Sequence, residues 1–291
     1  MITVSSPDFS KLRKGSVHLF CGFPKSGKTT AISTFGDRGS ESVITIDVDD
    51  GTDYIEDMHR IKVYSLLPPT VLKDGNWEIV PALERGYNDI NGNPVEAWSY
   101  IEAVDYLKNN WKSLGYDSIA LDTADAFLGW LNEYMVGFLK EKDADSKNPR
   151  YQDAMDIGDF EFAAGHAAVR NKVMERVTEL TNIVRNTGQV LITTHMNKTI
   201  SVRDNKTVIP QKLPNLPEKL AQWLGGTADT ICMISRNDRG QNVCTFDGYG
   251  ESMLGTRLSP LLGKSVVFTK GGETTLYKQI MRLLNNNSKE A

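Results

Sequence analysis

The sequence predicts an α/β fold with a mostly parallel central sheet, and three observations support this fold class. Short apolar runs typical of buried strands recur along the chain, at residues 16–21, 42–48, 118–121 and 190–194. Segments with apolar residues at helical spacing lie between them, notably 97–114 and 169–184. A glycine-rich loop joins the first run to a short helical segment. Strands that alternate with helices form parallel sheets, so these elements predict one α/β core.

The loop after the first strand carries the most specific pattern in the chain. Residues 22–29 fit the phosphate-binding pattern G-x-x-x-x-G-K-[ST] at every fixed position. Glycines let such a loop wrap around a phosphate, and its N–H groups point inward at the start of a helix. Lys28 would reach the β- and γ-phosphates of a nucleotide, and Thr29 would bind Mg²⁺. The predicted nucleotide contacts are Gly22, Phe23, Pro24, Lys25, Ser26, Gly27, Lys28, Thr29 and Thr30.

Two further elements and an insertion are expected in the first half of the chain. A short helix over 29–35 follows the loop, and 60–66 has strand character. The stretch 68–97 is punctuated by Gly, Asn and Pro and includes Asn91-Gly92, which predicts a rim insertion or hairpin. No internal repeat or linker is visible, so we expect a single domain over 1–291 with this insertion.

The second half is expected to hold two loops and an antiparallel edge. The polar run 140–150 predicts a mobile loop before a helix, and the basic segment 197–219 predicts another loop. The apolar runs 230–235 and 241–246 flank a turn, and 266–268 adds a strand. These late strands would extend the sheet antiparallel at its edge.

Bulk composition bounds the class of protein. The chain has 291 residues, 40% hydrophobic and 24% charged, with a net charge of −4, so nucleic-acid contact would need a local basic patch. Neither a long apolar run nor a signal peptide is present, and we expect a cytoplasmic protein with no membrane contact. Cys21, Cys232 and Cys244 form no C-x-x-C pair and are expected to be buried free thiols, rather than a disulfide or metal site.

Polar side chains follow three of the predicted strands. Asp122 closes the run 118–121, where a Walker B carboxylate would hold Mg²⁺ through water; the alternative is a strand-end cap. The second strand ends in acidic residues 47–50, which would lie beside the phosphate loop if those strands were neighbours; the alternative is a solvated turn. His195 follows the strand 190–194 and could sense a γ-phosphate, or be structural.

A basic segment leaves the same predicted sheet end as His195. A loop of this kind could track a nucleic-acid backbone, with affinity that falls as salt rises. The alternative is a solvated surface loop, because Asp204 and Glu218 dilute its charge. Its cations are Lys198, Arg203, Lys206, Lys212 and Lys219.

The order of these motifs resembles the RecA-like ATPase core, and in particular phage-encoded single-domain ATPases, a group that includes single-strand annealing recombinases. The segments that carry the resemblance are 22–30, 46–49, 118–122, 190–195 and 228–230. The resemblance implies ATP and Mg²⁺ as cofactors, single-stranded DNA as partner, and a homo-oligomer with nucleotide between subunits in the host cytoplasm. It places DNA-binding loops at 137–160 and 197–219.

The resemblance also assigns catalytic roles. Asp49 would match the glutamate that polarises water, and His195 the glutamine that senses the γ-phosphate, with Lys28 as the third catalytic residue. Both matches are departures in residue type, and the shorter Asp49 implies slow turnover. A neighbouring subunit would supply a cation to the γ-phosphate. Candidates for that cation are Arg236, Arg239, Arg257 and Lys264.

The resulting functional hypothesis is a Mg²⁺-dependent ATPase that acts on single-stranded DNA in phage recombination or replication. One alternative is a nucleotide-gated assembly or loading factor with little hydrolysis and no direct DNA role. A second is a small-molecule phosphotransferase, but the long spacing from Lys28 to Asp122 and the extra late strands count against it.

Overall fold

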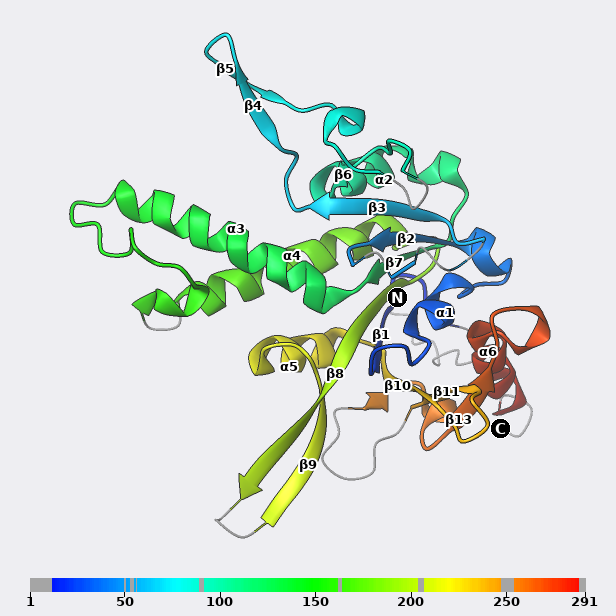
Figure 1. Cartoon of the computed structure of the whole chain (residues 1–291). Helices are drawn as coiled ribbons and strands as arrows, with labels where there is room; N and C mark the ends of the chain where they lie inside the picture. Colours follow the sequence, from blue (N-terminus) through cyan, green and yellow to red (C-terminus); the bar gives the residue numbers. More distant parts are fainter. Residues whose placement is uncertain are drawn as a thin grey trace, which may run out of the picture.

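A central, mostly parallel sheet organises the protein, as the computed structural model in Figure 1 shows. The structure describes residues 12–49, 51–52, 55, 57–88, 92–161, 164–203, 207–246 and 254–287. The strands lie in the spatial order β13, β11, β10, β1, β8, β7, β2, β3, β6. In chain order they are β1 (Val17–Gly22), β2 (Val43–Asp47), β3 (Arg60–Ser65), β6 (Trp98–Ser99), β7 (Ser118–Asp122), β8 (Val190–Arg203), β10 (Thr230–Arg236), β11 (Asn242–Thr245) and β13 (Ser265–Phe268).

Strand directions confirm the predicted α/β fold class. β1 pairs in parallel with β8 and β10, β7 pairs in parallel with β8 and β2, and β3 continues the parallel set beside β2. At the other edge, β11 is antiparallel to both β10 and β13, as predicted for the late strands. A short strand, β12 (Gly255–Thr256), also pairs antiparallel with β10. Because the inner strands are parallel, their carboxyl ends share one edge of the sheet.

Helices cover both faces of this sheet (Figure 1). One face packs against α2 (Tyr100–Leu114), α3 (Ala124–Ala144), α4 (Ala164–Val184) and α5 (Glu218–Thr227). The other packs against α1 (Lys28–Ser33) and α6 (Leu276–Asn287). Side chains of β1 alternate between the two layers: Leu19 and Cys21 lie in the first, Phe20 in the second. The sheet is therefore buried on both sides, as parallel sheets generally are.

Local sequence explains where the helix α2 begins. Ser99 caps it by accepting a hydrogen bond from the Glu102 backbone N–H, while the Glu102 carboxylate accepts one from the Ser99 N–H. Gly115, with φ 74°, ends the helix. The cysteine prediction is also confirmed: Cys21, Cys232 and Cys244 are buried free thiols.

One predicted loop was wrong, and a second was right only in part. The segment 197–219 is not a loop, because β8 continues to Arg203 and pairs antiparallel with β9 (Thr207–Pro214), and α5 begins at Glu218. β-Branched residues among the charges favour the extended backbone. The polar run 140–150 begins inside α3, which reaches Ala144 and was not predicted as a helix, whereas 145–150 lie in the predicted non-helical connection to α4. The antiparallel ribbon that β8 and β9 form projects from the body of the protein (Figure 1).

A second hairpin projects from the opposite part of the sheet (Figure 1). It consists of β4 (Thr70–Lys73) and β5 (Asn76–Ile79), and we call it the β4–β5 arm. Its turn is Asp74-Gly75, with φ 51° and 82°, a dipeptide that suits a tight hairpin. The predicted turn at Asn91-Gly92 falls partly outside the described residues. In the described part of the chain, no helix is long and apolar enough to cross a membrane.

Candidate nucleotide-binding site

The predicted phosphate-binding loop joins the end of β1 to the start of α1, and both of its fixed glycines are sterically required. A Cβ at Gly22 would lie 2.4 Å from the Ser26 Oγ and 2.6 Å from the Ile234 carbonyl oxygen. Gly27 has φ 98°, and a Cβ there would lie 2.7 Å from the Asn242 Oδ1. Any larger residue would therefore displace the loop from its neighbours.

Lys28 lies inside the loop. Its Nζ donates hydrogen bonds to the carbonyl oxygens of Gly22 and Phe23, each at 3.2 Å. Burial lowers the pKa of Lys28, although the nearby carboxylates of Asp122 and Asp125 act in the opposite direction. The ammonium group is thus held in a recess whose walls are carbonyl oxygens and carboxylates.

Thr29 and Asp122 meet although 93 residues separate them in the chain. The Thr29 hydroxyl donates to Asp122 Oδ2 at 2.7 Å, and the Thr193 hydroxyl donates to Oδ1 of the same carboxylate. Burial raises the pKa of Asp122, and these two hydrogen bonds offset part of the effect. The peptide bond between Asp122 and Thr123 is cis. The two predicted metal-binding residues therefore lie side by side at the carboxyl edge of the sheet.

Asp49 reaches the site by a different route from the one expected. β2 is not a neighbour of β1, since β8 and β7 lie between them. Asp49 is exposed; its carboxylate accepts hydrogen bonds from the Thr123 hydroxyl at 3.3 Å and the Gly51 N–H at 3.1 Å. Its charge still acts on both Lys28 and Asp122. The common carboxyl edge, not strand adjacency, brings it close.

His195 lies beside the loop because β8 pairs with β1 in a register that sets it opposite Gly22. Its Nδ1 lies 2.7 Å from Asp125 Oδ2, and its backbone N–H donates to Asp125 Oδ1 at 3.1 Å. Burial raises the pKa of Asp125, but the hydrogen bonds with His195 outweigh it and hold that pKa below its usual value. Asp125 lies in the first turn of α3. Because the sequence did not predict this helix, no role was expected for Asp125.

The other predicted contacts line the same loop. Ser26 is buried, and its Oγ has no hydrogen-bond partner among the described residues. Phe23 packs against the core, whereas Pro24 and Lys25 are exposed and Thr30 is half-buried. Of the candidate cations, Arg257 is engaged within the chain, where it forms an ion pair with Asp229 at 3.8 Å.

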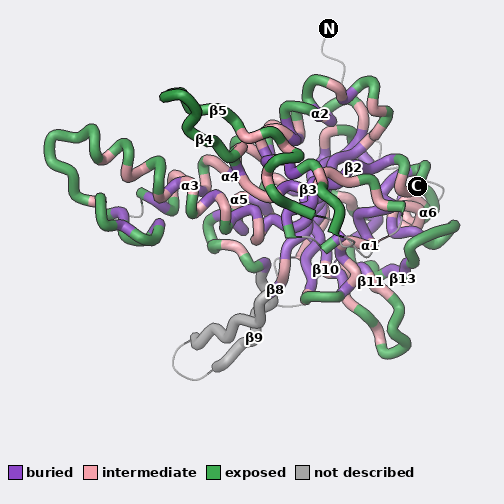
Figure 2. The backbone as a smooth tube through the Cα atoms, turned by 45° about the horizontal axis from the view of Figure 1, so that its top comes forward, coloured by how far each residue is buried: buried purple, intermediate pink, exposed green. Residues whose placement is uncertain are grey.

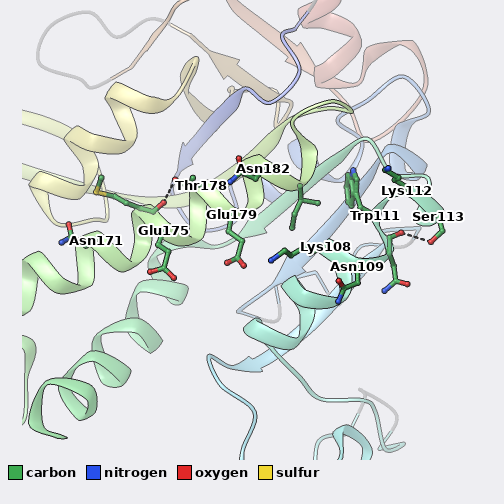
Figure 3. Close-up of a pocket in the computed structure, with 13 residues that line it drawn as sticks. Lys108, Asn109, Trp111, Lys112, Ser113, Asn171, Glu175, Thr178, Glu179 and Asn182 are labelled. Atoms are coloured by element: carbon green, nitrogen blue, oxygen red, sulfur yellow. Dashed lines mark hydrogen bonds between the residues drawn. The ribbon is translucent and has the colours of Figure 1, made fainter. Parts of the chain in front are cut away.

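A groove of about 1050 Å³ lies away from this site, between α2 and α4 (Figure 3). The α2 wall carries Lys108 and Lys112, and the α4 wall carries Glu175 and Glu179. Trp111 is nearly buried there and donates from Nε1 to the Thr187 hydroxyl at 3.1 Å. None of the predicted nucleotide contacts lines this groove.

Comparisons with known proteins place the chain in a family. No functionally curated protein matches the chain. Similar solved structures include the KaiC-like protein PH0186 from the hyperthermophilic archaeon Pyrococcus horikoshii OT3, at 10% identity and a TM-score of 0.39, over 89% of this chain and 87% of that chain. The RadB recombinase aligns at 13% identity and a TM-score of 0.40, over 89% of each chain. The AAA domain family AAA_24 matches residues 14–258, most of the chain, so this P-loop protein belongs to that family.

Proposed function

We propose that the protein binds and hydrolyses ATP with Mg²⁺. The hydrogen bond between Thr29 and Asp122 is the observation that carries the proposal, since these are the hydroxyl and carboxylate that a P-loop needs around the metal. Thr29 would bind Mg²⁺ directly and Asp122 through water. Bound Mg²⁺ would neutralise charge on the phosphates.

The residues of the loop and its neighbours fit ATP and Mg²⁺. Glycines that would clash with Ser26 and Asn242 if they carried a Cβ leave the loop backbone free to approach phosphate. In the described residues, no group of three His, Cys, Asp or Glu side chains could hold a metal, so Mg²⁺ would depend on the nucleotide for further ligands. Lys28 would exchange its two carbonyl contacts for phosphate oxygens.

His195 and Asp49 would act on the far side of the phosphate. Asp125 occupies Nδ1 of His195, so Nε2 is the nitrogen that would face a γ-phosphate oxygen. The exposed Asp49 carboxylate would orient the attacking water, held by the Thr123 hydroxyl. These roles make Lys28, Asp49 and His195 the proposed catalytic residues.

We further propose that single-stranded DNA binds the ribbon of β8 and β9, as part of recombination or replication in a phage. The ribbon sequence carries Lys198, Arg203, Lys206 and Lys212, and a cationic surface attracts the phosphate backbone. β8 also carries His195, which gives the nucleotide and the DNA a common structural element. The active form would be a homo-oligomer with ATP between subunits, in the cytoplasm of the host.

ATP hydrolysis at low salt, measured with and without single-stranded DNA, tests both parts of this proposal. Lys28→Ala is the blank, because it removes the cation from the loop. A Lys28-dependent rate that DNA raises, and that salt then lowers, would support the full proposal. A Lys28-dependent rate indifferent to DNA would keep the ATPase and refute the DNA role.

A nucleotide-gated assembly or loading factor is the second candidate function. The observation in its favour is the exposure of Asp49, whose side chain is also one methylene shorter than glutamate. Both features weaken the hold on an attacking water. ATP binding that Lys28→Ala abolishes, with no measurable hydrolysis under any condition, would favour this candidate over the ATPase.

A further inference from the structure

The hairpin of β10 and β11 forms one wall of the phosphate-binding loop. β10 lies beside β1, on the side away from β8 and β7, and β11 is the next strand outward. Gly22, at the start of the loop, approaches β10, where its Cβ would lie 2.6 Å from the Ile234 carbonyl oxygen. Gly27 approaches β11, where a Cβ would lie 2.7 Å from the Asn242 Oδ1. Both fixed glycines of the loop therefore lie against this hairpin.

Asn242 carries its side chain on the face of the sheet where α1 lies. It precedes Cys244 by two positions in β11, so the two side chains point to the same face. Cys244 is buried in the layer that also contains Ala31 and Ile32 of α1. The Asn242 side chain is half-buried, and its amide forms no hydrogen bond with any residue that the structure describes. A free donor and a free acceptor thus lie against the phosphate-binding loop.

The other asparagine of the hairpin has a structural role. Asn237 Oδ1 accepts hydrogen bonds from the backbone N–H groups of Arg239 at 3.0 Å and Gln241 at 2.9 Å, and its Nδ2 donates to the Gln241 Oε1 at 3.0 Å. These bonds hold the turn, whose residues 238–241 are exposed (Figure 2). Asn237 therefore fixes the hairpin, and the Asn242 amide contributes no bond to it.

The proposed metal and γ-phosphate contacts lie on the other side of the loop. Asp122 ends β7 and His195 lies in β8, whereas β10 and β11 lie across β1 from both. In the proposed function the triphosphate runs along the loop, with its γ end toward Asp122 and His195. Its nucleoside would then leave the loop toward β10 and β11. The base is the part of the nucleotide that Asn242 would meet.

We propose that Asn242 recognises the adenine base and makes the site selective for ATP. One edge of adenine presents the N6 amino donor beside the N7 acceptor, and an asparagine amide matches both in a bidentate pair. Guanine presents two acceptors at this edge, O6 and N7, so the amide would lose one of its two hydrogen bonds. The assignment rests on the proposed function, because it requires a nucleotide held by Lys28 and the loop.

Competition against a fluorescent ATP analogue labelled on the ribose, with Mg²⁺ present, tests this assignment. The competitors are ATP, 7-deaza-ATP, which has a C–H group in place of N7, and ITP, which has an oxygen in place of the amino group. Each analogue removes one hydrogen bond, so the wild-type protein should bind it about 3- to 10-fold more weakly than ATP. Asn242→Ala should bind all three alike. Asn109→Ala, at an exposed asparagine of α2, is the matched control and should keep the preference for ATP.

Two results would overturn this inference and leave the proposed function in place. One is a wild-type protein that binds 7-deaza-ATP and ITP as tightly as ATP, in an interaction that Lys28→Ala abolishes. The other is a preference for ATP that persists in Asn242→Ala. The wild-type comparison needs no variant, so it decides the matter even if circular dichroism shows Asn242→Ala to be misfolded. If no nucleotide binds in a Lys28-dependent way, the proposed function itself fails, and this assignment fails with it.

Discussion

Replacing Asp125 with Asn tests whether His195 acts on the nucleotide. The Asp125 carboxylate accepts two hydrogen bonds from His195, from Nδ1 at 2.7 Å and from the backbone N–H at 3.1 Å. A hydrogen bond to a charged group contributes about 1.5–3 kcal/mol, and each 1.4 kcal/mol lost from the transition state slows a reaction about tenfold. We therefore expect Asp125→Asn to lower kcat for ATP hydrolysis by about 10- to 100-fold, with KM nearly unchanged.

Steady-state hydrolysis of Mg-ATP measures this effect, and two variants sharpen it. Glu141→Gln is the control, since Glu141 is exposed and lies on the same helix, α3, near its far end. His195→Gln removes the partner, so adding Asp125→Asn to it should have no further effect if the carboxylate works through His195. A normal kcat in Asp125→Asn, or a raised KM with unchanged kcat, would refute the reasoning.

Three further predictions concern the metal site, the phosphate-binding loop and the ion pair between Arg85 and Glu102. Asp122→Asn should raise the Mg²⁺ concentration needed for half-maximal ATP binding by about 10-fold or more, because it removes the carboxylate charge; a magnesium titration with a fluorescent ATP analogue measures it. Gly27→Ala should lower the free energy of unfolding by about 1–3 kcal/mol in urea, since φ 98° is strained for Ala and Asn242 crowds the Cβ. Glu102→Gln should remove an acid-labile contribution. Its bond to Arg85 lowers the pKa of Glu102 from 4.5 to about 2, so the stability gained is present above pH 4.5 and lost as pH falls toward 2. The Glu102 side chain is 30% exposed, so after solvent screening we expect about 1–2 kcal/mol, measured as the difference between wild-type and Glu102→Gln unfolding at pH 7 and pH 3.

Local patterns were sufficient for the buried core of the fold. Apolar runs and helical spacing depend only on neighbouring residues, so β1, β2, β7, α2 and α4 could be predicted within a few residues. The phosphate-binding loop could be predicted equally well, because all fixed positions of its pattern lie within residues 22–29. The strand order could not be predicted, because no local pattern near β2 indicates that β7 and β8 separate it from β1.

The missed elements have physical reasons of their own. α3 carries glycines at 129 and 137 and a charged end, which obscure the apolar face formed by Phe127, Leu131 and Met135. The β8–β9 ribbon projects from the sheet, so its sequence lacks the apolar runs of a buried strand. Asp125 could have been found from Thr123, a helix N-cap whose side chain accepts from the Ala126 N–H. A strand followed by such a cap predicts a helix, and hence an acidic first turn facing the strand ends.

The position of β8 in the sheet bears on how nucleotide and DNA binding would be coupled in the proposed function. β8 lies between β1, which leads into the phosphate-binding loop, and β7, which ends in Asp122. The same strand carries His195 and continues to Arg203, where it pairs with Thr207. At 3.3 Å per residue, the eight residues from His195 to Arg203 span about 26 Å, too far for DNA at the tip to touch the phosphate. In the proposed function, coupling to DNA held at that end would therefore pass along the paired backbone, as a rigid movement of the ribbon when His195 changes position. Removing the ribbon tip should abolish stimulation by DNA and leave basal hydrolysis unchanged; stimulation that survives the deletion would refute DNA binding at the tip.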